Sequence, residues 1–302
     1  MGTPEFAVPS LTILLDNHYN VPAVVTAPDK PRGRGQQLSP TPIKNVALQH
    51  KLPVLQPSIL NDPDFVTAIR NLHPDLIVVV AFRILPKEVF TIPKLGSFNL
   101  HASLLPKYRG AAPINWAIIN GETETGVTTF LLQEAVDTGN ILLQARTPIA
   151  PSDDAGTMHD KLAEIGAEIV LHTVRLIEQG KAAPKAQDNS LASPAPKIFK
   201  EDCKINWKQP AVAIHNRIRG LSPHPAAFTI HDNRVLKIFR SQVTDISSRR
   251  GSGEIVVKAD SLHVATADCM LAITELQQEG KKRMPVQEFL RGYKITTGER
   301  LE

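Results

Sequence analysis

The stretch NLHASLLP at residues 99–106, followed by RGAAP at residues 109–113, decides how the fold and chemistry of this chain are interpreted. It begins at the end of a short apolar segment that is predicted to be a strand. Because side chains alternate between the two faces of a strand, Asn99, His101 and Ser103 are expected to point the same way. In a parallel α/β sheet, ligands bind beyond the carboxyl ends of the strands. An amide and an imidazole there can polarise a carbonyl group and move a proton.

Strand and helix signals alternate around this stretch. The clearest strand is LIVVVA at residues 76–81, a continuous run typical of a covered parallel sheet. Strands are predicted at residues 21–25, 53–55, 76–81, 96–101, 126–132 and 141–145. Helices are predicted at residues 8–17, 43–50, 62–72, 114–120 and 157–179. This alternation predicts an α/β domain over residues 1–180 with a doubly wound, Rossmann-like sheet.

The composition changes after residue 180. Residues 181–205 are rich in proline and polar residues with little periodicity, and are predicted to link two domains. A helix is then expected at residues 210–220. Short strands are expected at residues 227–230, 235–239, 253–258, 261–266 and 270–276. One helix and five short strands suit a small OB-like β-barrel over residues 206–302, a frequent nucleic-acid binder.

The charge of the chain is concentrated in its last third. Residues 1–205 contain 19 basic and 20 acidic residues, whereas residues 206–302 contain 15 and 10, for a net charge of +4. A region that touches a polyanion is expected to show such an excess. A solvated face with slightly more lysine than usual explains the charge equally well.

Several classes of protein are disfavoured by what the sequence lacks. No apolar run approaches the roughly 20 residues that span a bilayer, and the first residues do not resemble a signal peptide. Cys203 and Cys269 are isolated, without metal-ligand spacing or the pattern of a disulfide framework. We therefore expect a protein of the reducing cytoplasm.

The stretch at residues 99–106 resembles the signature of the folate-dependent formyltransferases, most fully those that act on methionyl-tRNA, and the resemblance covers nearly the whole chain. It implies 10-formyltetrahydrofolate as the formyl donor and tetrahydrofolate as a product. The implied acceptor is the amino group of methionine on initiator Met-tRNA, which gives formyl-Met-tRNA for translation initiation. A monomer without a metal is expected.

The resemblance also implies roles for three residues. Asn99 and His101 would hold and polarise the formyl group. Asp137, in the turn EAVDTGN at residues 134–140, would orient His101 and help to remove the proton from the attacking amine. Asp and Gly are ordinary turn residues, so this assignment depends on the match to the family.

The folate pocket is expected at two loops. The loop AFRILP at residues 81–86 is one residue shorter than the family pattern Ala-Tyr-Gly-x-Ile-Leu-Pro and carries Arg83. The hydroxyl of Ser103 has an equally good explanation as a turn group. The expected folate-binding residues are Phe82, Arg83, Ile84, Leu85, Ser103, Leu104, Leu105 and Pro106.

Contacts with tRNA are expected from basic residues. The segment PDKPRGRGQQLSP at residues 28–40 resembles the loop by which the tRNA-formylating members approach the acceptor end. Cations in this Pro/Gly-rich segment can contact phosphates or unpaired bases. The expected tRNA-binding residues are Lys30, Arg32, Arg34, Lys197, Lys281, Lys282 and Arg283.

The N-terminus departs from the family. Members of the family have an apolar strand before the Gly-Thr-Pro turn, whereas this chain starts at that turn with residues 1–4. The first strand of a doubly wound sheet is central. We therefore expect a translation start upstream of Met1, which mass spectrometry of the native protein would test.

Three other functions were weighed. A sugar-nucleotide formyltransferase would share the signature, but the basic segment at residues 28–40 argues against it. A formyltetrahydrofolate hydrolase would use water as the nucleophile and would not need a basic second domain. A non-catalytic RNA-binding module would explain the charge but not the combination of Asn99, His101 and Asp137.

Overall fold

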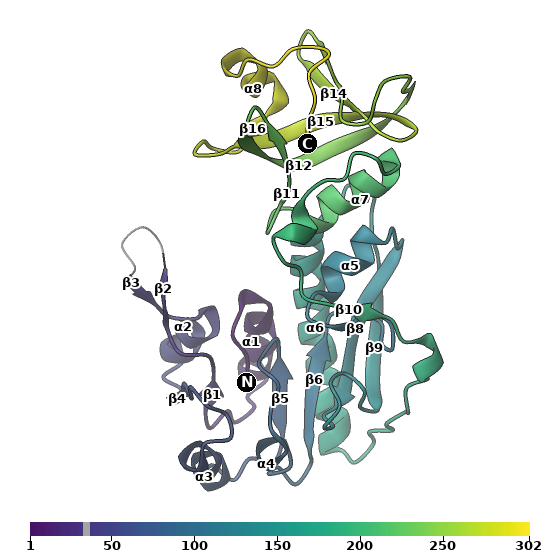
Figure 1. The fold of residues 1–302 in the computed structure, drawn as a ribbon. Coiled ribbons are helices and arrows are strands. Elements are labelled where there is room, and N and C mark those ends of the chain that lie inside the picture. Colours follow the sequence, from purple (N-terminus) through teal and green to yellow (C-terminus); the bar gives the residue numbers. More distant parts are fainter. Residues whose placement is uncertain (33–36) are drawn as a thin grey trace. The chain divides into compact units, whose positions relative to one another are not determined.

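The computed structural model describes residues 1–32 and 37–302, with the side chains of residues 32 and 37 excepted (Figure 1). The chain forms two compact units. The first comprises residues 1–110, 125–147 and 159–195, and the second comprises residues 111–124, 148–158 and 196–302. Residues 181–205, expected to link two domains, are therefore divided between the units at residue 195.

The first unit is built on a mixed sheet. Its strands are β1 (Val24–Val25), β4 (Val54–Leu55), β5 (Ile77–Val80), β6 (Ser97–His101), β8 (Glu124–Leu131) and β9 (Ile141–Pro148). β1 pairs in parallel with β4, and β5 in parallel with β6, in a sheet of order β5-β6-β8-β9. β8 runs antiparallel to β6, so the sheet is mixed on this side. The residue pattern of a buried strand identifies the strand but carries no signal for its direction.

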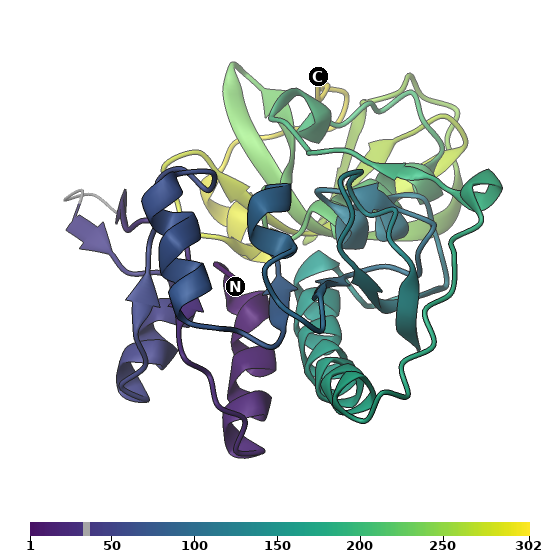
Figure 2. The ribbon, with the colours of Figure 1, turned by 90° about the horizontal axis from the view of Figure 1, so that it is seen from below.

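Helices lie on both faces of this sheet, as the doubly wound pattern predicts. The helical segments of the first unit are η1 (Glu5–Ala7), α1 (Val8–Asp16), α2 (Pro42–Gln49), α3 (Pro63–Asn71), α4 (Lys87–Phe90) and α6 (Ala155–Glu178). α1, α2 and α6 lie on one side and α3 and α4 on the other (Figure 2). The Asp62 carboxylate caps α3 by accepting a hydrogen bond from the Asp64 backbone N–H, as expected of an N-cap aspartate.

The packing of α6 shows which face of β6 is free for chemistry. A Cβ at Gly166 would lie only 2.6 Å from Leu100 Cδ2, so α6 packs directly on the Leu100 face. The hydroxyls of Thr129 and Thr173 are 2.8 Å apart, and Thr129 is the strand partner of Leu100. Because side chains alternate, Asn99 and His101 lie on the opposite face, toward α3 and α4.

Between β1 and β5, Met1 and Gly2 are the only described residues that supply backbone. The Gly2 N–H donates to Val25 O (3.0 Å), and the Val80 N–H donates to Met1 O (2.9 Å). The Met1 amino group donates to Val78 O at 2.6 Å. Met1 and Gly2 therefore bridge β1 and β5 through backbone hydrogen bonds.

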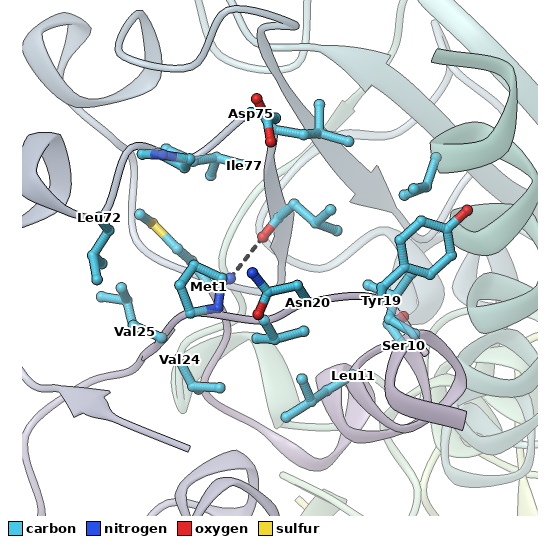
Figure 3. Close-up of a pocket in the computed structure, with 18 of the residues that line it drawn as sticks. Met1, Ser10, Leu11, Tyr19, Asn20, Val24, Val25, Leu72, Asp75 and Ile77 are labelled. Carbon is cyan, nitrogen blue, oxygen red and sulfur yellow. Dashed lines mark hydrogen bonds between the residues drawn. The ribbon is translucent and has the colours of Figure 1, made fainter. Parts of the chain in front are cut away.

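A cavity of about 450 Å³ lies beside this N-terminus (Figure 3). Apolar side chains from α1, β1 and β5 contribute most of its wall, including Leu11, Val24, Val25 and Ile77. The Met1 amino group is buried, and desolvation lowers its pKa from the ordinary 8.0 to about 5. The N-terminal charge is therefore disfavoured in the folded state.

Two short pairings complete the first unit. β2 (Lys30–Arg32) pairs antiparallel with β3 (Gln37–Ser39). β7 (Arg109–Gly110) pairs in parallel with β10 (Pro194–Ala195), which follows η2 (Asn189–Leu191). The predicted linker thus contributes a strand to the first unit, directly beside the start of the RGAAP segment.

The second unit combines helices with an antiparallel sheet. Its elements are α5 (Pro113–Ile119), η3 (Glu201–Cys203), α7 (Ala211–Leu221), β11 (Ala227–His231), β12 (Arg234–Ser247), β13 (Ile255–Lys258), β14 (Ser261–Ala265), β15 (Cys269–Gln278), β16 (Met284–Pro285) and α8 (Val286–Gly292). The strand order is β11-β12-β15-β14-β13, with β16 on β15. Ile218, Leu236, Ile273 and Phe289 are buried in its core.

The C-terminal tail joins the two edges of this sheet. Glu302 and Ile230, in edge strand β11, exchange two backbone hydrogen bonds of 3.0 and 3.1 Å. At the other edge, Ile255 N–H donates to Glu299 O and Leu301 N–H donates to Gly253 O. This closure by the tail fits the expected OB-like barrel, because a closed sheet leaves few unpaired edges.

Candidate active site

His101 ends β6 and is held by a backbone group. Its Nε2 lies 2.8 Å from Tyr108 O, which can only accept, so Nε2 carries a proton and donates. In the neutral ring Nδ1 is then an unprotonated acceptor. Nδ1 faces Asp137 Oδ2 at 3.8 Å, and the two side chains are only 7% and 10% exposed. The structure thus places a proton-accepting nitrogen beside a carboxylate in a nearly dry site.

Asp137 lies in the predicted turn between β8 and β9 and is held in a strained conformation. Its φ of 57° lies in the left-handed region, which costs a non-glycine residue about 1–3 kcal/mol. The Gly110 N–H donates to Asp137 Oδ2 at 2.9 Å. The expected approach of Asp137 to His101 is present, at a separation longer than a direct hydrogen bond.

Asn99 lies two residues before His101 on the same strand. It pairs with Val79 of β5 and Phe130 of β8, and is only partly buried. An amide on the face of His101 is thereby available to donate a hydrogen bond to a carbonyl oxygen. Asn99, His101 and Asp137 therefore lie around one end of β6, as the sequence predicts.

The loop after β6 is shaped by its own hydrogen bonds. Ser103 is fully buried, and its hydroxyl donates to Lys107 O at 2.6 Å. Thr128, the strand partner of His101, donates through its hydroxyl to Ser103 O and accepts from the Leu105 N–H. Ser103 and Leu105 are therefore turned into the protein, whereas Leu104 and Pro106 remain partly exposed.

The loop after β5 also contains both exposed and buried side chains. Ile84 is 71% exposed and Phe82 partly so, whereas Leu85 is buried in the core beneath α3 and α4. The guanidinium of Arg83 donates to Pro57 O (2.6 Å) and Ser58 O (2.9 Å). Arg83 and Leu85, both expected to bind folate, thus anchor this loop to the first unit, because their side chains are already engaged.

The stem of the basic segment is clamped by a polar cluster. Lys44 Nζ donates to Asp29 Oδ2 (2.6 Å) and Gln56 Oε1 (2.7 Å). Gln56 Nε2 in turn donates to Asp29 Oδ1 at 2.8 Å. Hydrogen bonds from Lys44 and Gln56 lower the pKa of Asp29, so this carboxylate stays charged. The cluster joins the segment before β2 to helix α2.

The basic residues expected to touch tRNA differ in their surroundings. Lys30 is exposed on β2, whereas Arg34 and the side chain of Arg32 lie outside the described part of the chain. Lys197, Lys281 and Lys282 are exposed in the second unit. Arg283 instead makes a two-pronged ion pair with Glu275, at 2.6 Å for each contact, and lies over the Phe239 ring. Arg283 is therefore mainly a structural cation.

Gln187 belongs to this site although no sequence motif marks it. It lies within residues 181–205, where the sequence predicts only a linker. Its side-chain amide contacts the Asp137 turn and Arg109 together. Pairings between distant segments, of β10 with β7 and of Lys185 with Ile141, bring it there.

Two further findings apply to the described residues alone. Among them, no group of three or more His, Cys, Asp or Glu side chains is arranged to hold a metal ion. None of the described helices combines the length and apolarity needed to cross a membrane.

Comparison with known families agrees with this geometry. Residues 1–174 match the family described as Formyl transferase, and residues 197–294 match the family described as Formyl transferase, C-terminal domain. The chain belongs to the formyl transferase family. Asn99, His101 and Asp137 all lie within residues 1–174, the range that matches the Formyl transferase family.

Relatives of known name are similar over nearly the whole chain. Methionyl-tRNA formyltransferase of Caldanaerobacter subterraneus subsp. tengcongensis is 49% identical over 300 residues, covering 99% of this chain and 97% of the relative. The protein of the same name from Bacteroides fragilis is 48% identical over 306 residues, covering 98% and 94%. Similarity at this level places the chain beside the tRNA-formylating members.

Solved structures share the fold at lower identity. WlaRD, a sugar 3N-formyl transferase solved in the presence of dTDP and 5-N-formyl-THF, is 24% identical with a TM-score of 0.67, covering 93% of this chain and 97% of its own. HypX from Aquifex aeolicus in complex with tetrahydrofolic acid is 19% identical with a TM-score of 0.60, covering 83% and 47%. At these identities the likeness concerns the fold alone.

Proposed function

We propose that this protein transfers the formyl group of 10-formyltetrahydrofolate to the amino group of methionine on initiator Met-tRNA. The observation that carries the proposal is the arrangement of Asn99, His101 and Asp137 at the end of β6. The relatives at 48–49% identity, which are named methionyl-tRNA formyltransferases, support this choice of acceptor.

The reaction divides between these side chains. The methionine amine attacks the formyl carbon and forms a C–N bond, and the carbonyl oxygen becomes an oxyanion. The Asn99 amide stabilises that charge, because donors aimed at a developing oxyanion lower the barrier. Nδ1 of His101, facing Asp137, takes the proton that leaves the amine. The bond from the formyl carbon to the folate nitrogen then breaks, and His101 returns the proton to that nitrogen.

The loops around β6 offer a surface that suits the folate. Phe82 and Ile84 present apolar side chains after β5, and Leu104 and Pro106 do so after β6. A flat heteroaromatic ring is held well by an apolar wall with a few backbone polar groups. We assign the folate contacts to these four side chains and to the backbone of the same loops, while Arg83, Leu85, Ser103 and Leu105 keep the loops in place.

The acceptor side is assigned to basic residues. Lys30, Arg32 and Arg34 in the first unit, and Lys197, Lys281 and Lys282 in the second, supply charges for the tRNA backbone. Transfer to an amino sugar is less well supported, because the sugar formyltransferase matches only at 24% identity.

A direct assay tests the function. We expect this protein, supplied with 10-formyltetrahydrofolate, to convert Met-tRNA to formyl-Met-tRNA, as measured by acid-gel separation of the charged tRNAs. Reactions with an amino-sugar nucleotide, or with no acceptor, are expected to release tetrahydrofolate at less than a hundredth of that rate. Faster formylation of the sugar, or hydrolysis without an acceptor, would contradict the proposal.

Loosening the clamp at the basic segment is expected to affect the acceptor alone. Lys44→Met removes the ammonium that joins Asp29 to Gln56, so we expect the KM for Met-tRNA to rise about 3- to 10-fold, because a mobile segment must be ordered on binding. The KM for the formyl donor and kcat should change less than twofold. Lys51→Met, which removes an exposed lysine just after α2, is the matched control. Equal effects of the two changes would point to net charge as the cause.

A further inference from the structure

The side-chain amide of Gln187 has all four of its hydrogen-bonding positions filled. Its oxygen accepts from Arg109 Nε (3.2 Å) and Arg109 Nη2 (2.7 Å). Its nitrogen donates to Asp137 O (2.9 Å) and Gly139 O (2.8 Å). Guanidinium groups only donate and carbonyls only accept, so the orientation of the amide is fixed. Gln187 therefore holds together two segments that precede it by about 50 and about 80 residues, at Asp137 and at Arg109.

These contacts form a closed ring that includes Asp137. The ring leads from Asp137 O through Gln187 to Arg109 and on along the chain to Gly110. The Gly110 N–H then donates to Asp137 Oδ2, the oxygen that faces His101. The ring thus contacts both the backbone carbonyl and the carboxylate of Asp137.

The turn that the ring holds would relax without it. Asp137 has a φ of 57°, a conformation that persists in a non-glycine residue only where the surroundings enforce it. Gly139 lies so close to β8 that a Cβ there would be 1.6 Å from Leu131 O, which fixes the far end of the turn. Asp137 itself is held by hydrogen bonds from Gln187 to its carbonyl and from Gly110 to its carboxylate, and a second bond from Gln187 reaches the Gly139 carbonyl.

We propose that Gln187 is a positioning residue for the formyl-transfer reaction: it holds Asp137 at the distance from His101 at which the pair accepts the proton of the attacking amine. This inference rests on the proposed function of the His101–Asp137 pair. Reactive groups displaced by about 1 Å can lose about 10²-fold in rate, so the hold matters even though Gln187 does not touch the substrate.

A Gln187→Met variant tests this role, because methionine has a similar length but makes no strong hydrogen bond. We expect kcat for formyl-Met-tRNA formation to fall about 10- to 100-fold, while the KM for each substrate changes less than twofold. Gln187→Glu keeps the acceptor for Arg109 but loses both donors, and is expected to be at least as impaired. Asn189→Ala removes the other partner of Arg109, leaves the ring intact, and should change kcat less than twofold.

A double-mutant cycle shows whether Gln187 acts through Asp137. In an Asp137→Asn background, Gln187→Met should cost less than twofold more, because the group that it positions is already impaired. Loss of the full 10- to 100-fold in that background would overturn the inference, as would a kcat for Gln187→Met within twofold of the unmodified protein. An equal loss in Asn189→Ala would assign the effect to Arg109 instead.

Amide hydrogen exchange separates failure of this inference from failure of the proposed function. In Gln187→Met, peptides covering residues 108–112 and 134–140 should exchange faster, because the ring includes the Gly110 N–H. Unchanged exchange would overturn the positioning role, whatever the reaction. If the unmodified protein does not formylate Met-tRNA, the proposed function fails while the exchange result still decides the structural hold.

Discussion

Replacement of His101 by Ala is expected to lower kcat for formyl transfer to Met-tRNA by about 10³-fold, within the range that one general base or oxyanion donor contributes. The reason is that Nδ1 is the proton acceptor next to Asp137, and no other described imidazole is placed beside that carboxylate. Asn99→Ala should lose about 10²- to 10³-fold by removing one oxyanion donor. Single-turnover measurements with saturating Met-tRNA would separate this chemical step from binding.

The change at His101 also removes a hydrogen bond, so its effect on folding needs a control. His101→Ala removes the hydrogen bond that His101 donates to the buried Tyr108 carbonyl, which costs about 0.5–1.5 kcal/mol of stability. His101→Gln retains an N–H donor for that carbonyl but has no proton-accepting nitrogen. We expect the Gln variant to be close to the unmodified protein in thermal unfolding and as inactive as the Ala variant. A kcat within threefold of the unmodified protein would remove His101 from the mechanism.

Local sequence signals predicted those parts of the fold that depend on neighbouring residues. The run at residues 76–81 predicted β5 because a long apolar, β-branched segment is stable only as a covered strand. The capping pair Asn61-Asp62 located the start of α3 to within a residue, because a cap acts within one turn, and Asp62 is the cap. Asn99 and His101 could be placed on one face because side chains alternate along a strand, whereas Asp137 was assigned through the resemblance to the family.

Features that depend on distant partners could not be predicted in this way. β12 runs over Arg234–Ser247, well beyond the predicted 235–239, because pairing with β15 carries it through three register shifts into polar residues. Strand β16 and helix α8 were not predicted at all. All three cations at residues 281–283 are predicted to contact tRNA, yet Arg283 is paired with Glu275, which pairing of β15 with β16 brings beside it. Gln187 could not be predicted either, because its contacts at the active site are with residues far from it in the sequence.

A chain that begins at Met1 is expected to depend on pH in its stability. The Met1 amino group has a pKa of about 5 in the folded protein against an ordinary value of 8.0, so between pH 5 and 8 the unfolded chain binds a proton that the folded chain does not. The free energy of unfolding therefore rises with pH over this window, by about 1.4 kcal/mol per pH unit and about 4 kcal/mol in total. Urea unfolding at pH 5, 6, 7 and 8, with an intact Met1 verified by mass spectrometry, measures this slope.

Two N-terminal extensions distinguish the buried charge from the cavity beside it. Six Gly and Ser residues placed before Met1 move the ammonium into water, and should abolish the slope between pH 5 and 8. Six Val and Ile residues should abolish the slope too, and should also raise the free energy of unfolding at pH 8 by several kcal/mol, because each buried side chain contributes about 1.5–3 kcal/mol. They would fill the cavity of about 450 Å³ beside β1 and β5 and pair with both strands. Equal stabilities of the two extended chains would mean that this cavity does not accept a strand. A slope that persists in the Gly/Ser chain would place the titrating group elsewhere.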